Sequence, residues 1–336
     1  MDSSQSKIEG PIFRPRQGLG GGHRQTLAAF FLPRKITLPA PEERLVEVEP
    51  KVKILCHCHW QNDRKKALTI LAVHGLEGSS ESQYMLGVAH KALAAGMNVV
   101  RMNQRNCGGT DALAPVLYHS GLSSDVAAVA RNLLEQDGIA HLALAGFSMG
   151  GNLVLKLAGE WGRQAPPQLR AVAAVCPAMD LAASADALHD RRNRLYEYYF
   201  LWKLRRRMRA KAKLFPGHFD VRRLRRLTSL RDFDDKITAY YCGFTGAADY
   251  YSRAAAANVV DRIAVPTLIL HAANDPFIRI LPDTRKKILS NPKITFIETE
   301  DGGHCSFIAT AVDGHDGHWA EHQVVQFLRG FQPERK

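Results

Sequence analysis

The 336-residue sequence has no apolar run long enough to cross a lipid bilayer. Its longer apolar stretches, such as Leu27–Leu32, fall far short of the roughly 20 residues that a membrane-spanning helix needs. The segment Met1–Lys7 lacks the apolar region of a secretory signal peptide. Without an export signal, six scattered cysteines predict free thiols rather than a disulfide framework. We therefore expect a cytoplasmic protein.

Acidic residues are also few, because 33 Asp and Glu face 45 Lys and Arg, which gives a net charge of +12. Residues 191–236 contain 16 of the basic residues and only 5 of the acidic ones, so this segment carries nearly the whole excess. A uniformly basic chain would indicate nucleic acid or another anionic partner. Here the charge is a property of one segment, and the rest of the chain is close to neutral.

Short apolar runs alternate with helical patterns through most of the chain, which is typical of a mostly parallel sheet flanked by helices. The predicted strands are Leu68–Val73, Asn98–Met102, His141–Ala145, Ala171–Val175, Thr267–His271 and Ile294–Glu298. The predicted helices are Tyr84–Ala95, Leu122–Gln136, Asn152–Glu160 and Trp319–Leu328. The sequence thus predicts the α/β class.

A long segment without strand-like runs separates the fourth and fifth of these strands. It is helical, basic and aromatic, which predicts a cap inserted into the sheet domain. We expect residues 1–181 to form the first part of the core, 182–250 the helical cap, and 251–336 the second part of the core.

Ahead of this alternation, Leu45–Trp60 is predicted to form antiparallel strands that include Cys56-His57-Cys58-His59. Alternate side chains of a strand point to opposite faces, so these four residues alone cannot surround one metal ion. No second Cys/His pair follows at zinc-site spacing. We expect a structural strand here and no metal site.

The segment Gly146–Gly150 fits the pattern Gly-x-Ser-x-Gly, with Ser148 at its centre. It follows a predicted strand and precedes a predicted helix, which is the context in which this motif forms a sharp turn. The glycines are needed because the turn leaves no room for side chains beside the serine. Ser148 is therefore the candidate nucleophile.

A serine hydroxyl is a weak nucleophile at neutral pH, so it needs a base and the base needs an orienting acid. In this architecture the chain order is serine, then acid, then histidine. Asp275 and His304 follow the last two predicted strands, and the carboxyl ends of parallel strands meet at one edge of the sheet. The other candidate acids are Asp180 and Asp301. The other candidate histidines are His271, His315, His318 and His322.

An ester-cleaving site also needs donors for the oxyanion. The backbone N–H of Met149, directly after the serine, is one candidate. The second is the backbone N–H of Leu76, in the loop His74–Gly78 that follows the first predicted strand. We expect His74 to brace this loop rather than to transfer protons.

The chain resembles the α/β-hydrolase fold family and, within it, the YheT-like branch. Besides the serine motif, the resemblance rests on several segments that match in order and spacing, over roughly residues 10–330. These segments are Gly22–Thr26, His74–Gly78, Asn103–Gly109, Tyr118–Gly121, Asp234–Tyr251, Asn274–Phe277 and Gly302–His304. Arg24 departs from the usual leucine, which leaves the role of the amino-terminal segment open.

The resemblance implies a hydrolase of carboxylic esters with short- to medium-chain acyl groups, with Ser148 as nucleophile, Asp275 as acid and His304 as base. Acyl transfer to an alcohol by the same residues is the alternative function. A non-catalytic binding module is a third, which the intact set of three residues disfavours. We expect a small-molecule ester as substrate and no metal or organic cofactor.

The basic cap admits three interpretations. Leu195, Tyr198, Tyr199, Trp202 and Leu204 have the spacing of one apolar helix face, with arginines and lysines crowded beyond them. In the first interpretation, the cap is a solvated lid whose aromatic face covers Ser148. In the second, it is a helix that binds an anionic membrane surface. In the third, it is a site for an anionic substrate or nucleic acid. No nucleic-acid-binding motif supports the last of these.

Overall fold

A computed structural model describes residues 12–312 and 314–333 of the chain. Its centre is one eight-stranded sheet with the order β1-β2-β4-β3-β5-β6-β7-β8. The pairs β1–β2 and β2–β4 are antiparallel, and all other neighbouring strands are parallel. The strands are β1 Glu42–Glu49, β2 Val52–His59, β3 Thr69–Val73, β4 Asn98–Met102, β5 Leu142–Phe147, β6 Leu169–Val175, β7 Thr267–Ala272 and β8 Ile294–Thr299.

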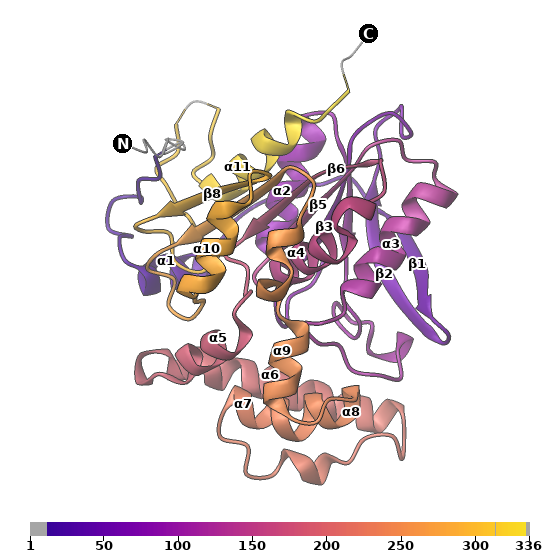
Figure 1. Cartoon of the computed structure of the whole chain (residues 1–336), viewed down its shortest axis with the longest axis vertical. Coiled ribbons are helices and arrows are strands. Elements are labelled where there is room, and N and C mark those ends of the chain that lie inside the picture. Colours follow the sequence, from indigo (N-terminus) through magenta and orange to yellow (C-terminus); the bar gives the residue numbers. More distant parts are fainter. Residues whose placement is uncertain (1–11, 313, 334–336) are drawn as a thin grey trace.

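Helices cover both faces of this sheet (Figure 1). Helices α3 (Ser123–Gln136), α4 (Met149–Trp161) and α10 (Pro282–Ser290) contribute buried side chains to the core on one face. Helices α2 (Gln83–Ala94) and α11 (Trp319–Arg329) contribute to the core on the other face. Strands β3, β4, β5 and β7 are buried along their whole length, which explains their continuous apolar runs. The predicted α/β class is confirmed.

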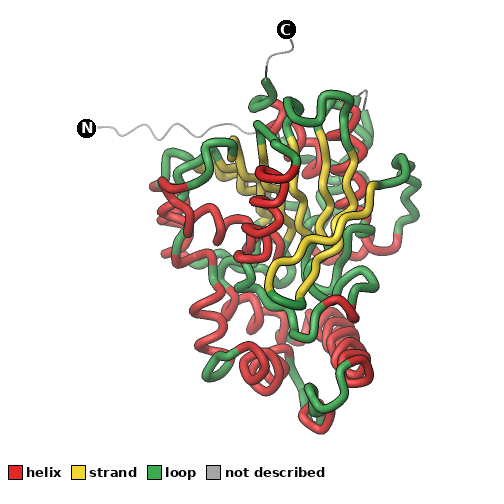
Figure 2. Tube along the Cα trace, turned by 90° about the vertical axis from the view of Figure 1, so that its right-hand side faces the viewer, coloured by secondary structure: helices red, strands yellow, loops and turns green. Residues whose placement is uncertain are grey.

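The segment between β6 and β7 forms a layer of helices at the carboxyl edge of the sheet (Figures 1 and 2). Its longest helix is α6, which contains the arginines and lysines between residues 203 and 213. The layer contains α5 Leu181–His189, α6 Arg194–Leu214, α7 Leu230–Phe233, a π-helical segment Asp234–Ala239, α8 Tyr240–Cys242 and α9 Ala247–Ala254. The helical character predicted for this segment is confirmed, while the bounds 182–250 of the inserted cap stay a prediction.

Three helices differ from the sequence prediction. Helix α4 begins at Met149, three residues before the predicted start at Asn152. Gly150 and Gly151 have low helix propensity, which is why the sequence predicted the later start. The first helix, α1 (Gly22–Phe31), and helix α10 were not predicted. Both are short, with ten and nine residues.

Cys56 and Cys58 lie in β2 and are fully buried in the core, as a structural strand requires. His57 lies on the opposite face, 3.0 Å from a carboxylate oxygen of Glu81. Within the described residues, the groups of side chains that could hold a metal ion include none of Cys56–His59. The same part of the chain has no helix of the length and apolarity required to span a membrane.

Candidate active site

Ser148 lies in the turn between β5 and α4 with φ 53° and ψ −117°, a conformation that L-residues rarely adopt. The neighbouring glycines make the turn possible. A Cβ on Gly146 would lie 2.3 Å from the carbonyl oxygen of Gly150, and a Cβ on Gly150 would lie 2.2 Å from that of Val73. The chain therefore holds the serine in a strained turn at the carboxyl edge of the sheet.

Two loops bring His304 and Asp275 to this serine. The Nε2 atom of His304 lies 2.9 Å from Ser148 Oγ, and its Nδ1 atom lies 2.8 Å from Asp275 Oδ2. The three side chains thus form one continuous hydrogen-bonded line. A carboxylate at Nδ1 favours the tautomer with its proton there, which leaves Nε2 free to accept the serine proton.

Asp275 is fully buried and is held by backbone groups of its own loop. The N–H groups of Phe277 and Ile278 donate to its Oδ1 atom at 3.1 and 2.9 Å. Burial favours the neutral acid, but His304 and these donors outweigh burial and lower the pKa of Asp275. Burial likewise opposes a charge on His304, yet the Asp275 carboxylate raises the pKa of His304 above its usual 6.5.

The alternative acids have structural partners elsewhere. Asp180 accepts hydrogen bonds from Leu281 N–H and Thr284 Oγ1 at the start of α10. Asp301 accepts from the N–H of Gly21 and the side chain of Asn274. Neither carboxylate is hydrogen-bonded to His304.

The alternative histidines are also occupied or remote. His271 is buried in β7, the rings of His315 and His322 pack together at 4.8 Å, and His318 precedes α11. Among the described residues, no hydrogen bond joins any of these four to Ser148.

The expected oxyanion donors, the backbone N–H groups of Leu76 and Met149, belong to residues that line the same cavity as Ser148. Met149 is the first residue of α4, so its N–H has no acceptor within the helix. The Leu76 N–H belongs to the same peptide group as the Gly75 carbonyl. The Gly75 carbonyl oxygen contacts His74 Nδ1 at 2.7 Å and accepts a hydrogen bond from Gly78 N–H at 3.1 Å, so these contacts fix the orientation of the peptide group.

His74 is fully buried, and its Nε2 accepts a hydrogen bond from Gln104 N–H at 3.0 Å. Its Nδ1 must therefore donate to Gly75 O. Burial lowers the pKa of His74 to about 4, which keeps the ring neutral at physiological pH. The predicted bracing role of His74 agrees with these contacts.

The amino-terminal segment contacts the His304 loop, a role that sequence reasoning left open. Thr26 Oγ1 accepts from His304 N–H at 2.9 Å, and the Gln25 side chain bonds both backbone groups of Ile308. A Cβ on Gly22 would lie 1.9 Å from the Asn274 carbonyl oxygen. Arg24 points away from this contact and is exposed, so its departure from leucine leaves the contact intact.

The cap contacts the loop His74–Gly78 through Glu77. The sequence analysis did not predict this contact. Arg207 of α6 pairs with both carboxylate oxygens of Glu77 at 2.8 and 3.0 Å. Lys203 donates to the Glu77 carbonyl oxygen at 2.6 Å, and Tyr118 Oη donates to the Glu77 carboxylate at 2.8 Å. Glu77 has a φ of 56° and directly follows Leu76, so the cap and this loop are mechanically connected.

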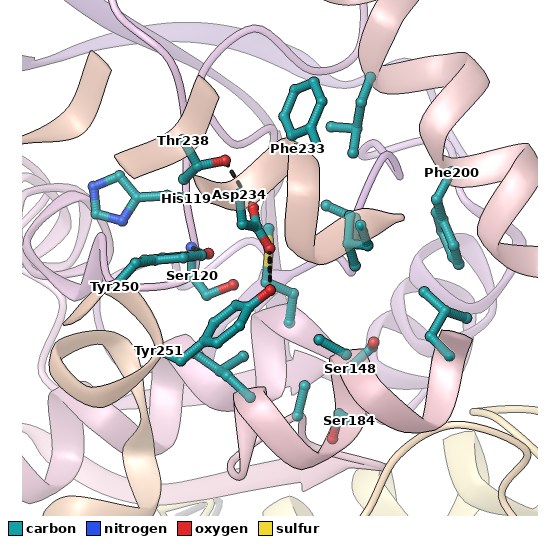
Figure 3. Close-up of a pocket in the computed structure, with 18 of the residues that line it drawn as sticks. His119, Ser120, Ser148, Ser184, Phe200, Phe233, Asp234, Thr238, Tyr250 and Tyr251 are labelled. Carbon is teal, nitrogen blue, oxygen red and sulfur yellow. Dashed lines mark hydrogen bonds between the residues drawn. The ribbon is translucent and has the colours of Figure 1, made fainter. Parts of the chain in front are cut away.

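Two cavities reach Ser148. The inner chamber runs under the cap and is mostly apolar, with a polar cluster at Asp234, Thr238 and Tyr251 (Figure 3). Asp234 accepts hydrogen bonds from both of these hydroxyls, and burial raises the pKa of Asp234 to about 6. The outer groove runs between α1 and α6 and also contains His304 in its wall.

Comparison with known proteins agrees with this architecture. The family described as alpha/beta hydrolase fold matches residues 69–310. The Escherichia coli (strain K12) protein named "Putative esterase YheT" is 31% identical over 320 residues, which cover 94% of this chain and 92% of that protein.

More distant relatives are similar over part of their length or in fold alone. The phospholipase ABHD3 of Mus musculus is 29% identical over 71% of this chain, which spans 58% of that protein. The esterase Pf2001 of Pyrococcus furiosus superposes with a TM-score of 0.58 at 15% identity, over 90% of this chain and 99% of that structure. The fold, the serine turn and the full-length similarity to YheT agree, and the chain belongs to the α/β-hydrolase fold family.

Proposed function

We propose that the protein is a serine hydrolase of carboxylic esters and that Ser148, His304 and Asp275 are its catalytic residues. The observation that carries the proposal is the continuous line of hydrogen bonds from Asp275 through His304 to Ser148 in a strained turn. Relatives named as esterase, phospholipase and monoacylglycerol lipase support the same reaction class.

The reaction proceeds through an acyl-enzyme. Ser148 Oγ attacks the ester carbonyl carbon while His304 Nε2 takes the serine proton, and Asp275 stabilises the resulting imidazolium. The N–H groups of Leu76 and Met149 bind the oxyanion of the tetrahedral intermediate. His304 then protonates the departing alcohol. A water molecule deprotonated by His304 attacks the acyl-enzyme, which releases the acid and restores Ser148.

We assign the acyl chain to the inner chamber and the alcohol portion to the outer groove. Most of the inner chamber is lined by aliphatic and aromatic side chains, which favour an acyl group of short to medium length. The outer groove is open to solvent and carries both apolar and charged side chains, which suits a more varied alcohol.

Acyl transfer is the second candidate, with an alcohol in place of water in the second half-reaction. The outer groove supports it, because an alcohol bound there would lie beside His304. A relative named medium-chain fatty acid ethyl ester synthase/esterase 2, from Saccharomyces cerevisiae, is 26% identical over 90% of this chain. Analysis of products formed with added ethanol or glycerol distinguishes ester exchange from hydrolysis.

The predicted contact with an anionic membrane remains part of the proposal, but its location changes. Lys203, Arg207 and Lys211 of the basic cap point into the protein and are bonded there, so they are unavailable to lipid. The contact is then left to the exposed basic residues of the cap, on the outward face of α6 or among residues 222–226.

The test of the catalytic proposal is Ser148→Ala. We expect this variant to lose hydrolysis of p-nitrophenyl butyrate and labelling by a fluorophosphonate probe, because both require the serine nucleophile. Ser290→Ala, an exposed serine at the end of α10, is the matched control and should retain both. Hydrolysis by Ser148→Ala at the rate of the unaltered protein would refute the proposal.

A further inference from the structure

Helix α6 buries long basic side chains beside the apolar residues Leu201, Leu204 and Met208, which is unusual for an amphipathic helix. Lys203, Arg207 and Lys211 follow one another at intervals of four residues and so share one face. Lys203 and Arg207 bind Glu77, while the fully buried Lys211 bonds Asn106 and the Asp111 carbonyl oxygen, each at 2.9 Å.

The opposite face of α6 presents apolar side chains to solvent. Leu195 is 83% exposed, Tyr198 68% and Trp202 48%. These residues belong to the apolar face predicted from the sequence, and of that set only Leu204 packs in the core beneath the cap. The interpretation in which this face covers Ser148 therefore does not hold for its most exposed members, Leu195, Tyr198 and Trp202.

Helix α1 extends this apolar face. Phe30 contacts Tyr199 edge to face at 5.6 Å, and Phe30 and Phe31 are 59% and 72% exposed. His23 and Tyr196 stack at 5.8 Å and join the two helices a second time. We call this the α1–α6 surface; its exposed apolar members are Leu27, Phe30, Phe31, Leu195, Tyr198 and Trp202.

Exposed arginines flank this surface, and the neighbouring acidic residue Asp190 pairs with Arg192. Arg24, Arg191, Arg194 and Arg206 are exposed on the same two helices or just before α6, and Arg206 lies 5.8 Å from the Trp202 ring. Within residues 12–312 and 314–333, none of the four forms a salt bridge. A second copy of the chain docked face to face would place these arginines against each other, which disfavours a symmetric dimer here.

The outer groove opens onto this surface and leads to the reacting serine. Leu27, Phe30 and Leu195 line the groove together with Ser148 and His304. If a binding partner covers the mouth of the groove, a substrate released from that partner would therefore reach Ser148 without crossing bulk water.

We propose that the α1–α6 surface docks on an anionic phospholipid surface, with its aromatic side chains at the headgroup level and its arginines on the lipid phosphates. Exposed apolar patches rimmed by cations bind such interfaces both by burying apolar side chains and by electrostatic attraction to the anionic lipids. The docking involves no step of the proposed reaction, so it stands or fails independently of the catalytic residues.

The test measures sedimentation of the full chain with phosphatidylcholine vesicles and with vesicles that also contain phosphatidylglycerol. We expect binding to the mixed vesicles only, weakened by added salt because exposed charges are screened. Tyr198→Ser combined with Trp202→Ser should weaken this binding by at least about tenfold. The matched control replaces two exposed leucines on other elements, Leu45→Ser with Leu289→Ser, and should bind normally.

Two further measurements make the result unambiguous. Hydrolysis of soluble p-nitrophenyl butyrate should be unchanged in the Tyr198/Trp202 variant, since neither side chain lines the two cavities, and this result shows that the variant is folded. Ser148→Ala should bind vesicles as the unaltered protein does. Absence of binding to the mixed vesicles, equal loss in the control, or a dimer in light scattering that the Tyr198/Trp202 variant dissociates would each overturn the proposal.

Discussion

At the scale of single residues, the proposed site depends on how Asp275, His304 and Ser148 are each held in place. Asp275 has two backbone donors on one oxygen and His304 on the other, so its carboxylate has little freedom to rotate. His304 is held at its side chain by Asp275 and at its backbone by Thr26. The serine needs no partner of this kind, because the strained turn fixes it.

Asp275→Asn tests the role of this carboxylate. We expect kcat to fall by about 10⁴-fold, because the amide no longer selects the productive tautomer of His304. The general base must be neutral, so kcat/KM of the unaltered protein should rise as the pH rises through the pKa of His304, which Asp275 holds above 6.5. Without that charge, the rising limb should move to lower pH.

The measurement is a pH profile of p-nitrophenyl butyrate hydrolysis for both proteins, with exposed Asp283→Asn as the control. A rising limb that stays at the same pH in Asp275→Asn would contradict the assignment.

At the scale of secondary-structure elements, the orientation of α6 shows the limit of periodicity. Spacing alone grouped Leu195, Tyr198, Tyr199, Trp202 and Leu204 on one face, and one of the three interpretations placed this face over Ser148. The preference of an apolar stripe for the interior is a general tendency, but burying Arg207 and Lys211 requires specific acceptors. Glu77, Asn106 and Asp111 supply those acceptors from loops distant in sequence, and no local pattern reveals that they are there.

Arg207→Met tests the connection between this helix and the oxyanion loop. Glu77 is nearly fully buried, so loss of its partner should reduce the free energy of unfolding by about 3–5 kcal/mol. We expect kcat to fall more than KM rises, because the displaced loop carries the Leu76 N–H. Urea unfolding and steady-state kinetics measure the two effects.

Arg209→Met, an exposed arginine of the same helix, is the control and should change neither quantity by much. Arg207→Met combined with Glu77→Met removes both charges and should recover much of the stability but not the activity. Full activity in Arg207→Met would show that α6 does not position the loop.

At the scale of the whole molecule, helix α1 packs against the loop that contains His304. Thr26 and His304 are separated by 278 positions in sequence, yet they share a hydrogen bond. The Gly22 carbonyl oxygen lies close to Gly303, and Gln25 bonds the backbone of Ile308. Helix α1 therefore supports the loop that contains His304, the proposed general base.

Thr26→Val tests this support, because it keeps the shape of the side chain but removes the acceptor for the His304 N–H. A buried unsatisfied donor costs about 1–3 kcal/mol, which the loop can relieve by moving His304 away from Ser148. We expect kcat to fall about tenfold or more, with a smaller change in KM. Thr26→Ser retains the hydroxyl and should restore most of the rate, whereas equal losses in both variants would indicate a packing role alone.

The sequence by itself determined the α/β class, the order of the strands along the chain and a short set of candidate site residues that includes Ser148, Asp275 and His304, because each depends on local signals. Buried parallel strands have continuous apolar runs, the serine turn needs glycines at fixed positions, and polar residues follow strand ends. The alternatives Asp180 and Asp301 were separated from Asp275 only by their partners in space.

Only the tertiary structure decided how the cap sits on this core. The inward direction of Lys203, Arg207 and Lys211, the outward aromatic face of α6 and the contact of α1 with the His304 loop all depend on pairs of residues far apart in the chain. Their physical reason is the same: a buried charge or a buried polar backbone group must find a specific partner, and only the folded chain places that partner within reach.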